Sequence, residues 1–293
     1  LVFNYVVQVG DNDGDGITLG ELSLNGGSLK NSTGTNFTLA LAGVASTANV
    51  LVDTAAPKVV SVAVPTSGSY RGDSNLNFSV RTSENIIVNT AGGTPSMIIT
   101  VGSTVRNASY VSGSGSTTLV FRYVVQRGET DVDGIVVDGL VLNSGTLKDN
   151  AGNNLALTLS SVGATTGVLV DASVPTAATL TTADTITTSA AFEINGIAEA
   201  GATIEVYVGT TRIGTSIADG AGGWSFTFAA GDLSEGDNSV SVIVEDSAGN
   251  RSAASTAIII TLRSVIEPPI VIPQPTERVI KDDLQLTGLL NDP

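Results

Sequence analysis

Residues 119–126 read Leu-Val-Phe-Arg-Tyr-Val-Val-Gln, and residues 1–8 read almost the same, Leu-Val-Phe-Asn-Tyr-Val-Val-Gln. Apolar or aromatic side chains occupy alternate positions of this stretch, at Leu119, Phe121 and Tyr123. Successive side chains of a β-strand point to opposite faces, so the alternation predicts a strand with one buried and one solvated face. Its recurrence also indicates an internal repeat.

The repeat extends well beyond these eight residues. Residues 1–57 align without a gap on residues 119–175, at an offset of 119 − 1 = 118, and 29 of the 57 positions are identical. Residues 54–171 are therefore expected to form one complete module, and residues 1–53 the C-terminal half of a preceding copy. Such a half-module would expose its core. Two interpretations stay open: the chain is a piece of a longer array, or strands of another chain complete the half-module.

The remaining sequence differs from this repeat but keeps the alternation. Residues 172–263 predict a second, shorter module, and residues 264–293 a proline-rich linker followed by the start of a further module, since four of the nine prolines fall within residues 267–275. Glycine-rich turns separate the predicted strands, and no convincing helical period is found. The predicted fold class is all-β, with tandem immunoglobulin-like β-sandwich modules in an extended rod.

The amino-acid composition disfavours several classes of function. The chain has 13 Lys and Arg against 28 Asp and Glu, a net charge of −15, which disfavours nucleic acid as a partner. It has no His and no Cys, so it lacks the residues of Ser-His-Asp and Cys-His nucleophiles and of thiolate or imidazole zinc sites. The sequence has no run of 18 or more apolar residues, so no membrane insertion is expected. We expect no enzyme, and any metal should have oxygen ligands, as Ca2+ prefers.

Several motifs resemble a known family. Residues 197–204 (Ile-Ala-Glu-Ala-Gly-Ala-Thr-Ile), 222–226 (Gly-Gly-Trp-Ser-Phe) and 245–250 (Glu-Asp-Ser-Ala-Gly-Asn) resemble the bacterial Ig-like (Big-type) repeats of giant RTX-type surface adhesins. The repeat that contains residues 140–153 resembles a second module type of the same proteins. The resemblance implies an extracellular, tandemly repeated stalk that spaces a terminal binding domain from the cell surface and is commonly stiffened by calcium.

Acidic loops offer a first set of candidate calcium ligands. Asp11, Asp13 and Asp15 alternate with small residues, and the carbonyl of Ile17 and the carboxylate of Glu21 follow, as in the first half of an EF-hand loop. The alternative is an acidic surface turn. The second copy offers a weaker version of this loop, in which the candidate ligands are Glu129, Asp131, Asp133, Ile135 and Asp138.

A second set of candidates is expected where successive modules meet. In a sandwich of this polarity the incoming linker, the end of the second strand and a late loop share one pole. These places hold Asp53, Glu84 and Asp149 in the complete repeat. They hold Asp171, Glu199 and Asp246 in the next module. Gathered carboxylates repel one another, so a bound calcium would lock the junction. The alternative is a set of solvated loop acids.

Together these features favour a structural extender segment of a bacterial cell-surface or secreted adhesin, rigidified by calcium at the junctions and in the acidic loops. Its partners would be the neighbouring modules of the same chain. One alternative is a module that binds carbohydrate or a host protein, for example through Arg71-Gly72-Asp73. Another is the subunit of an extracellular filament, whose neighbouring chains complete the half-module by strand donation.

Overall fold

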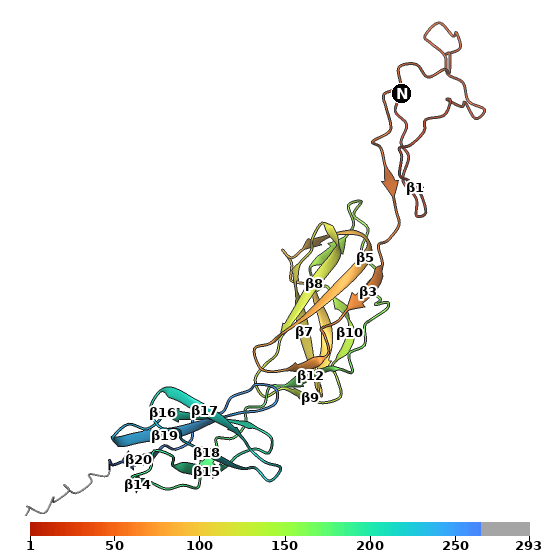
Figure 1. Cartoon of the computed structure of the whole chain (residues 1–293). Coiled ribbons are helices and arrows are strands. Elements are labelled where there is room, and N and C mark those ends of the chain that lie inside the picture. The colour runs from red at the N-terminus through yellow and green to blue at the C-terminus, as the bar shows by residue number, and fades with distance from the viewer. Residues whose placement is uncertain (265–293) are drawn as a thin grey trace, which may run out of the picture.

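The computed structural model describes residues 1–264, and it is built from strands, turns and loops without a helix in that part of the chain. None of the described residues therefore forms a helix suited to crossing a membrane. The chain runs as an elongated series of parts, from the N-terminal segment through two sandwiches (Figure 1). The fold is all-β, with immunoglobulin-like β-sandwich modules, as predicted. The predicted linker and further module lie, from residue 265 on, outside the described residues.

Residues 54–171, called the first module below, form two sheets. The larger sheet has the order β10-β6-β7-β8-β5-β11, with β3 also paired to β5, and the smaller one has the order β4-β12-β9. The strands are β3 (Val59–Ala63), β4 (Gly68–Tyr70), β5 (Asn75–Asn89), β6 (Ser96–Val101), β7 (Thr104–Ser112), β8 (Ser116–Val124), β9 (Thr130–Asp131), β10 (Val136–Val141), β11 (Thr146–Lys148) and β12 (Val168–Asp171).

Alternation along β5 and β8 builds the core of this module. Leu76, Phe78 and Val80 are fully buried, whereas the side chains between them face outward. Phe121 of β8 stands opposite Phe78 and is fully buried as well. The last strand, β12, pairs in parallel with β4 and antiparallel with β9, so the end of the module is hydrogen-bonded to a strand near its start.

Residues 172–263, called the second module, repeat this plan with a separate core. One sheet has the order β13-β15-β18 and the other β14-β20-β19-β16-β17, in which β14 and β20 pair in parallel. The strands are β13 (Thr179–Leu180), β14 (Thr185–Thr187), β15 (Glu193–Ile197), β16 (Thr203–Val208), β17 (Thr211–Ile217), β18 (Gly223–Thr227), β19 (Gly236–Glu245) and β20 (Ile258–Leu262). Trp224 is buried in this core, and its ring lies so close to Gly196 that a Cβ there would be 2.5 Å from Cζ2.

The N-terminal segment, residues 1–53, has no such core. Its strands are the two-residue β1 (Asn12–Asp13) and β2 (Val52–Asp53), which pair with each other. Phe3 is 71% exposed, whereas Phe121, the same position of the repeat, is 0% exposed. Equivalent positions of the repeat thus have opposite environments, because residues 119–171 pack against residues 54–118 and the N-terminal segment has no equivalent partner among the described residues.

Candidate metal centre at the module junctions

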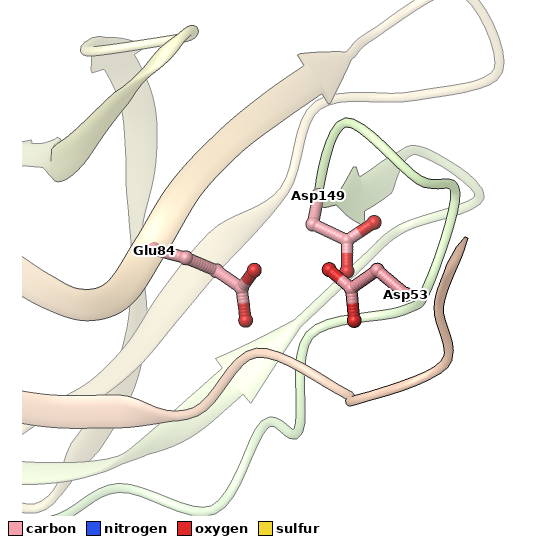
Figure 2. Close-up of side chains that lie close together, drawn as sticks. All are labelled: Asp53, Glu84 and Asp149. Atoms are coloured by element: carbon pink, nitrogen blue, oxygen red, sulfur yellow. The ribbon is translucent and has the colours of Figure 1, made fainter. Parts of the chain in front are cut away.

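Three carboxylates meet where the N-terminal segment joins the first module. One carboxylate oxygen from each of Asp53, Glu84 and Asp149 lies within 4.8 Å of the other two (Figure 2). Their sequence separations are large, yet the polarity of the sandwich predicted that all three share one pole. The structure brings these predicted residues together, and within residues 1–264 they form the one group of three or more acidic side chains this close to one another.

Local structure explains how each residue reaches this point. Asp53 is the last residue of β2, at the entry to the first module. Glu84 lies in β5 where its pairing with β8 shifts register between Arg81 and Ile86, and such irregularities redirect side chains. Asp149 follows β11, whose residue Lys148 pairs with Ile87 of β5, so this loop is held beside Glu84.

The three carboxylates differ in environment. Asp149 is buried, Glu84 is partly buried and Asp53 is exposed. Removal from water, followed by the charges of Asp53 and Asp149, raises the pKa of Glu84 above its ordinary value. The cluster therefore concentrates negative charge, and the protein does little to offset the charge of Glu84.

Asn153 connects this cluster to the linker. Its backbone N–H donates to Oδ1 of Asp149 and its side-chain amide to Oδ2, both at 2.8 Å. The same amide donates to the carbonyl oxygen of Asp53 at 3.1 Å. Sequence reasoning missed this residue, although the pattern Asp-x-Ala-Gly-Asn recurs in both modules, at residues 149–153 and 246–250.

The junction between the two modules repeats the arrangement. Asn250 donates to both carboxylate oxygens of Asp246 at 2.8 Å, and its side chain donates to the carbonyl of Asp171, also at 2.8 Å. Asp171, Glu199 and Asp246, the three predicted residues, line one cleft of about 500 Å³. Their carboxylates are not gathered as closely as those of the first junction, but the bracing of the linker carbonyl is the same.

The acidic loop of the N-terminal segment is arranged differently. Asp11 accepts hydrogen bonds from the Gln8 N–H at 2.7 Å and the Tyr5 hydroxyl at 2.8 Å, and these bonds lower its pKa. Asp13 accepts from the Gly16 N–H at 2.8 Å. The other predicted ligands, Asp15, Ile17 and Glu21, line an open hollow of about 860 Å³ together with Asp13. Asp11 and Asp13 therefore fold their own turn, and a calcium site here stays a prediction.

In the second copy of this loop the acidic residues make contacts within the first module. Glu129 pairs with Arg106 at 2.5 Å and accepts hydrogen bonds from the Tyr123 hydroxyl at 2.6 Å and the Gln126 N–H at 2.8 Å. Burial alone would raise the pKa of Glu129, but these partners outweigh it and lower the pKa. Burial and the bond to Glu129 raise the pKa of Tyr123 to about 12.

The other predicted ligands of that loop are also not directed to a common point. Asp131 is buried and accepts hydrogen bonds from the N–H groups of Gly102 and Gly134 at 2.6 and 2.7 Å. Asp138 accepts one from Thr100, the side chain of Ile135 is fully buried, and Asp133 is exposed. Glu129 and Asp131 thus anchor the loop to its own module, and a calcium site in this loop stays a prediction.

The Arg71-Gly72-Asp73 turn belongs to the junction between the modules. Nη1 of Arg71 donates to the carbonyl oxygen of Gly249 at 2.6 Å, and Asp73 pairs with Arg127 at 3.2 Å. Gly249 lies in the same Asp-x-Ala-Gly-Asn turn as Asn250. This junction is thus braced from both sides, by Arg71 of the first module and by Asn250 of the second.

Comparison with known proteins fits the second module. Residues 165–262 match the family model of a bacterial Ig-like domain. The match begins just before β12 of the first module and covers all of the second module except Arg263. No curated protein sequence matches the chain.

Several solved structures match the chain at low similarity. The fibronectin(III)-like modules of CbhA from Clostridium thermocellum are 15% identical, with a TM-score of 0.35 over 71% of this chain and 97% of that one. A Ca2+-stabilized adhesin that helps an Antarctic bacterium to reach out and bind ice is 19% identical, with a TM-score of 0.36 over 72% of this chain and 50% of that one. The BSP domain of a biofilm associated protein is 13% identical, with a TM-score of 0.24 over 71% and 30%. The chain thus spans half or less of the latter two.

Proposed function

We propose that this chain is a structural extender segment of a bacterial cell-surface or secreted adhesin, with junctions stiffened by calcium. The observation that carries the proposal is the meeting of Asp53, Glu84 and Asp149 at the entry to the first module. The match of residues 165–262 to a bacterial Ig-like domain supports a bacterial surface or extracellular setting. In this role the modules act by their length and mutual orientation, and they perform no catalysis.

The residues of the cluster suit calcium. Ca2+ takes six to eight oxygen ligands at roughly 2.3–2.6 Å, so oxygens on opposite sides of one ion are about 5 Å apart. The carboxylate oxygens of the cluster lie within 4.8 Å of one another, and no nitrogen or sulfur ligand is among them. Asp53, Glu84 and Asp149 would bind the ion, and it would supply the positive charge that the cluster lacks.

The position of Asp53 explains why an ion here would stiffen the chain. Asp53 belongs to the linker, whereas Glu84 and Asp149 belong to the body of the first module. Without a cation the three charges repel, and the hydrogen bond from Asn153 to the Asp53 carbonyl ties Asp53 to the module. With a cation the linker is tied to the module at two points, which restricts its direction.

The test is calcium titration of the full chain by calorimetry, together with small-angle scattering with calcium and with chelator. We expect binding, a rise in the thermal midpoint of the first module and a narrower distribution of end-to-end lengths. Asp149→Asn should weaken binding at least tenfold, whereas Glu193→Gln, which removes an exposed charge of the second module, should not. An unchanged midpoint and scattering curve at millimolar calcium would refute the proposal.

A further inference from the structure

Glu205 is a buried acid on the outer face of the second module. It belongs to β16 and lies between Ile204 and Val206, which are fully buried in the core. Because successive side chains of a strand point to opposite faces, the carboxylate of Glu205 points away from that core. Glu205 is nevertheless only 7% exposed. A charged group on an outer face is buried only where other side chains cover it, and its burial is costly unless they pair with it.

Two arginines and a tyrosine pair with this carboxylate. Nε of Arg212 lies 3.3 Å from Oε1 of Glu205, and Nη2 of Arg251 donates to Oε2. The Tyr207 hydroxyl donates to Oε2 at 3.1 Å and accepts from Nη2 of Arg251 at 2.9 Å. Arg212 comes from the edge strand β17, whereas Arg251 comes from the segment between β19 and β20. The two arginines thus tie Glu205 to different parts of the module.

Arg251 closes the turn that faces the first module. Residues 246–250, called the junction turn below, lie between Glu245 and Arg251, and these two residues form a β-bridge. Nε of Arg251 also lies 3.8 Å from Oε2 of Glu245. Glu205 belongs to β16 and Glu245 is the last residue of β19, so the guanidinium is held by two neighbouring strands. It therefore fixes the end of the junction turn to the sheet.

Two hydrogen bonds of the junction turn reach residues of the first module. The Gly249 carbonyl accepts from Arg71 at 2.6 Å, and the Asn250 side chain donates to the carbonyl of Asp171 at 2.8 Å. Hydrogen bonds weaken steeply when their distance or angle departs from the preferred geometry, so both bonds require the turn to keep its place. A displaced turn would release the direction of the second module relative to the first.

The first module has the same turn without this anchor. Its residues 149–153 repeat the Asp-x-Ala-Gly-Asn pattern, and a β-bridge between Lys148 and Asn154 closes the turn. Asn154 has the position that Arg251 has in the second module, and its amide carries no charge to pair with a buried carboxylate. The ion pairs that hold the junction turn are therefore a property of the second module.

We propose that Glu205 is a positioning residue of the junction between the two modules, and that it acts through Arg251 on the junction turn. Its carboxylate holds the guanidinium, the guanidinium holds the turn, and the turn presents Gly249 and Asn250 to the first module. The inference rests on the proposed extender role, because it names the residues that keep the direction of the chain at this junction. It involves no bound cation and is therefore tested in chelator.

The test measures the distribution of distances between the two modules in the full chain, in chelator, by pulsed electron spin resonance. The chain has no Cys, so Asn75→Cys and Thr227→Cys, at exposed positions of β5 and β18, place the two spin labels. Glu205→Gln and Arg251→Gln should each make this distribution about twice as wide as in the labelled chain without them. If Glu205→Gln does not fold, Arg251→Gln decides alone, because Arg212 still pairs with Glu205 in that variant.

Arg212→Gln is the matched control. It removes the other arginine of Glu205 but leaves Arg251 on the junction turn, so it should lower the thermal midpoint of the second module without widening the distribution. Equal widening by Arg212→Gln would overturn the proposal, since a general loss of stability would then explain the effect. An unchanged distribution in Arg251→Gln would overturn it too. So would loss of the unfolding transition of the second module in Arg251→Gln, because the arginine would then be needed for the fold itself.

The result is distinguishable from the test of calcium binding. Widening by Arg251→Gln in chelator supports the positioning role even if the calcium titration fails, and a failed titration refutes only the stiffening by calcium. Conversely, calcium binding at the first junction leaves the proposal refuted if the distance distribution of Arg251→Gln is unchanged.

Discussion

Replacing Glu84 by Gln should stabilise the first module when calcium is absent. The side chain keeps its size but loses the charge that faces Asp53 and Asp149 within 4.8 Å. Two unit charges at this distance repel by about 1 kcal/mol in a water-like dielectric and more in a drier one. Glu84 is only partly buried, so screening keeps the effect near the lower figure, and we expect about 1 kcal/mol, or roughly 4 °C in the midpoint.

The pH dependence should change in the same variant. The folded protein raises the pKa of Glu84, so the folded state binds more protons than the unfolded state above the ordinary pKa of 4.5. The stabilisation that comes from protonated Glu84 is fully present below pH 4.5. It is lost as the pH rises through the higher pKa that Glu84 has in the folded protein. Glu84→Gln should flatten this part of the stability curve.

Calcium should reverse the order of stability, so that the natural protein becomes more stable than Glu84→Gln. An ion that binds only the folded state adds about 2.7 kcal/mol when its concentration is 100 times the dissociation constant. The natural protein should gain most of this, and Glu84→Gln should gain less. Calorimetry in chelator and in millimolar calcium measures both cases, with Glu193→Gln, an exposed acid of the second module, as the control for general charge. A variant that is less stable than the natural protein in chelator would refute the repulsion argument.

Three further results are expected. Phe121→Ala should lower the free energy of unfolding of the first module by about 3–5 kcal/mol. Phe3→Ala, at the equivalent exposed position, should change it by less than about 0.5 kcal/mol. Equal losses of free energy in denaturant titrations would contradict the difference in burial. Arg71→Ala should broaden the angle between the two modules in scattering data without lowering either unfolding transition, and Arg81→Ala, on the exposed side of β5, should leave the angle unchanged. Tyr123 should ionise near pH 12 in an absorbance titration. The stabilisation from its protonated hydroxyl should be lost as the pH rises from about 10 through about 12. A titration midpoint near pH 10 would argue against the bond from Tyr123 to Glu129.

The sandwich fold could be predicted because alternation is a property of short stretches. Leu76, Phe78 and Val80 alternate with polar residues, and the structure buries all three. The same rule gives residues 1–8 an apolar face with Phe3 on it, but Phe3 is exposed, as expected for a half-module, because burial depends on a partner sheet. Periodicity therefore predicts which face of a strand is apolar, but not what covers it.

The acidic sites were predictable to different degrees. Asp53, Glu84 and Asp149 could be placed together because the polarity of a sandwich determines which loops share a pole. For Glu129 and Asp131 the spacing resembled a calcium loop, but their partners Arg106 and Gly102 are 23 and 29 residues away. The sequence signature of an acidic loop does not show which carboxylates meet at one point, because that depends on tertiary contacts.

The parallel pairing of β4 with β12, and of β14 with β20, has a mechanical consequence. In each module one of these strands lies near the entry of the chain and the other at its exit, and three residue pairs join them. Tension along the chain pulls the two strands in opposite directions within the plane of the sheet. The backbone hydrogen bonds between them are then loaded in shear and must break together, whereas in a hairpin pulled from its open end they would break one after another. Resistance to stretching therefore resides in the topology of each module, and it would persist when the junction acids carry no cation.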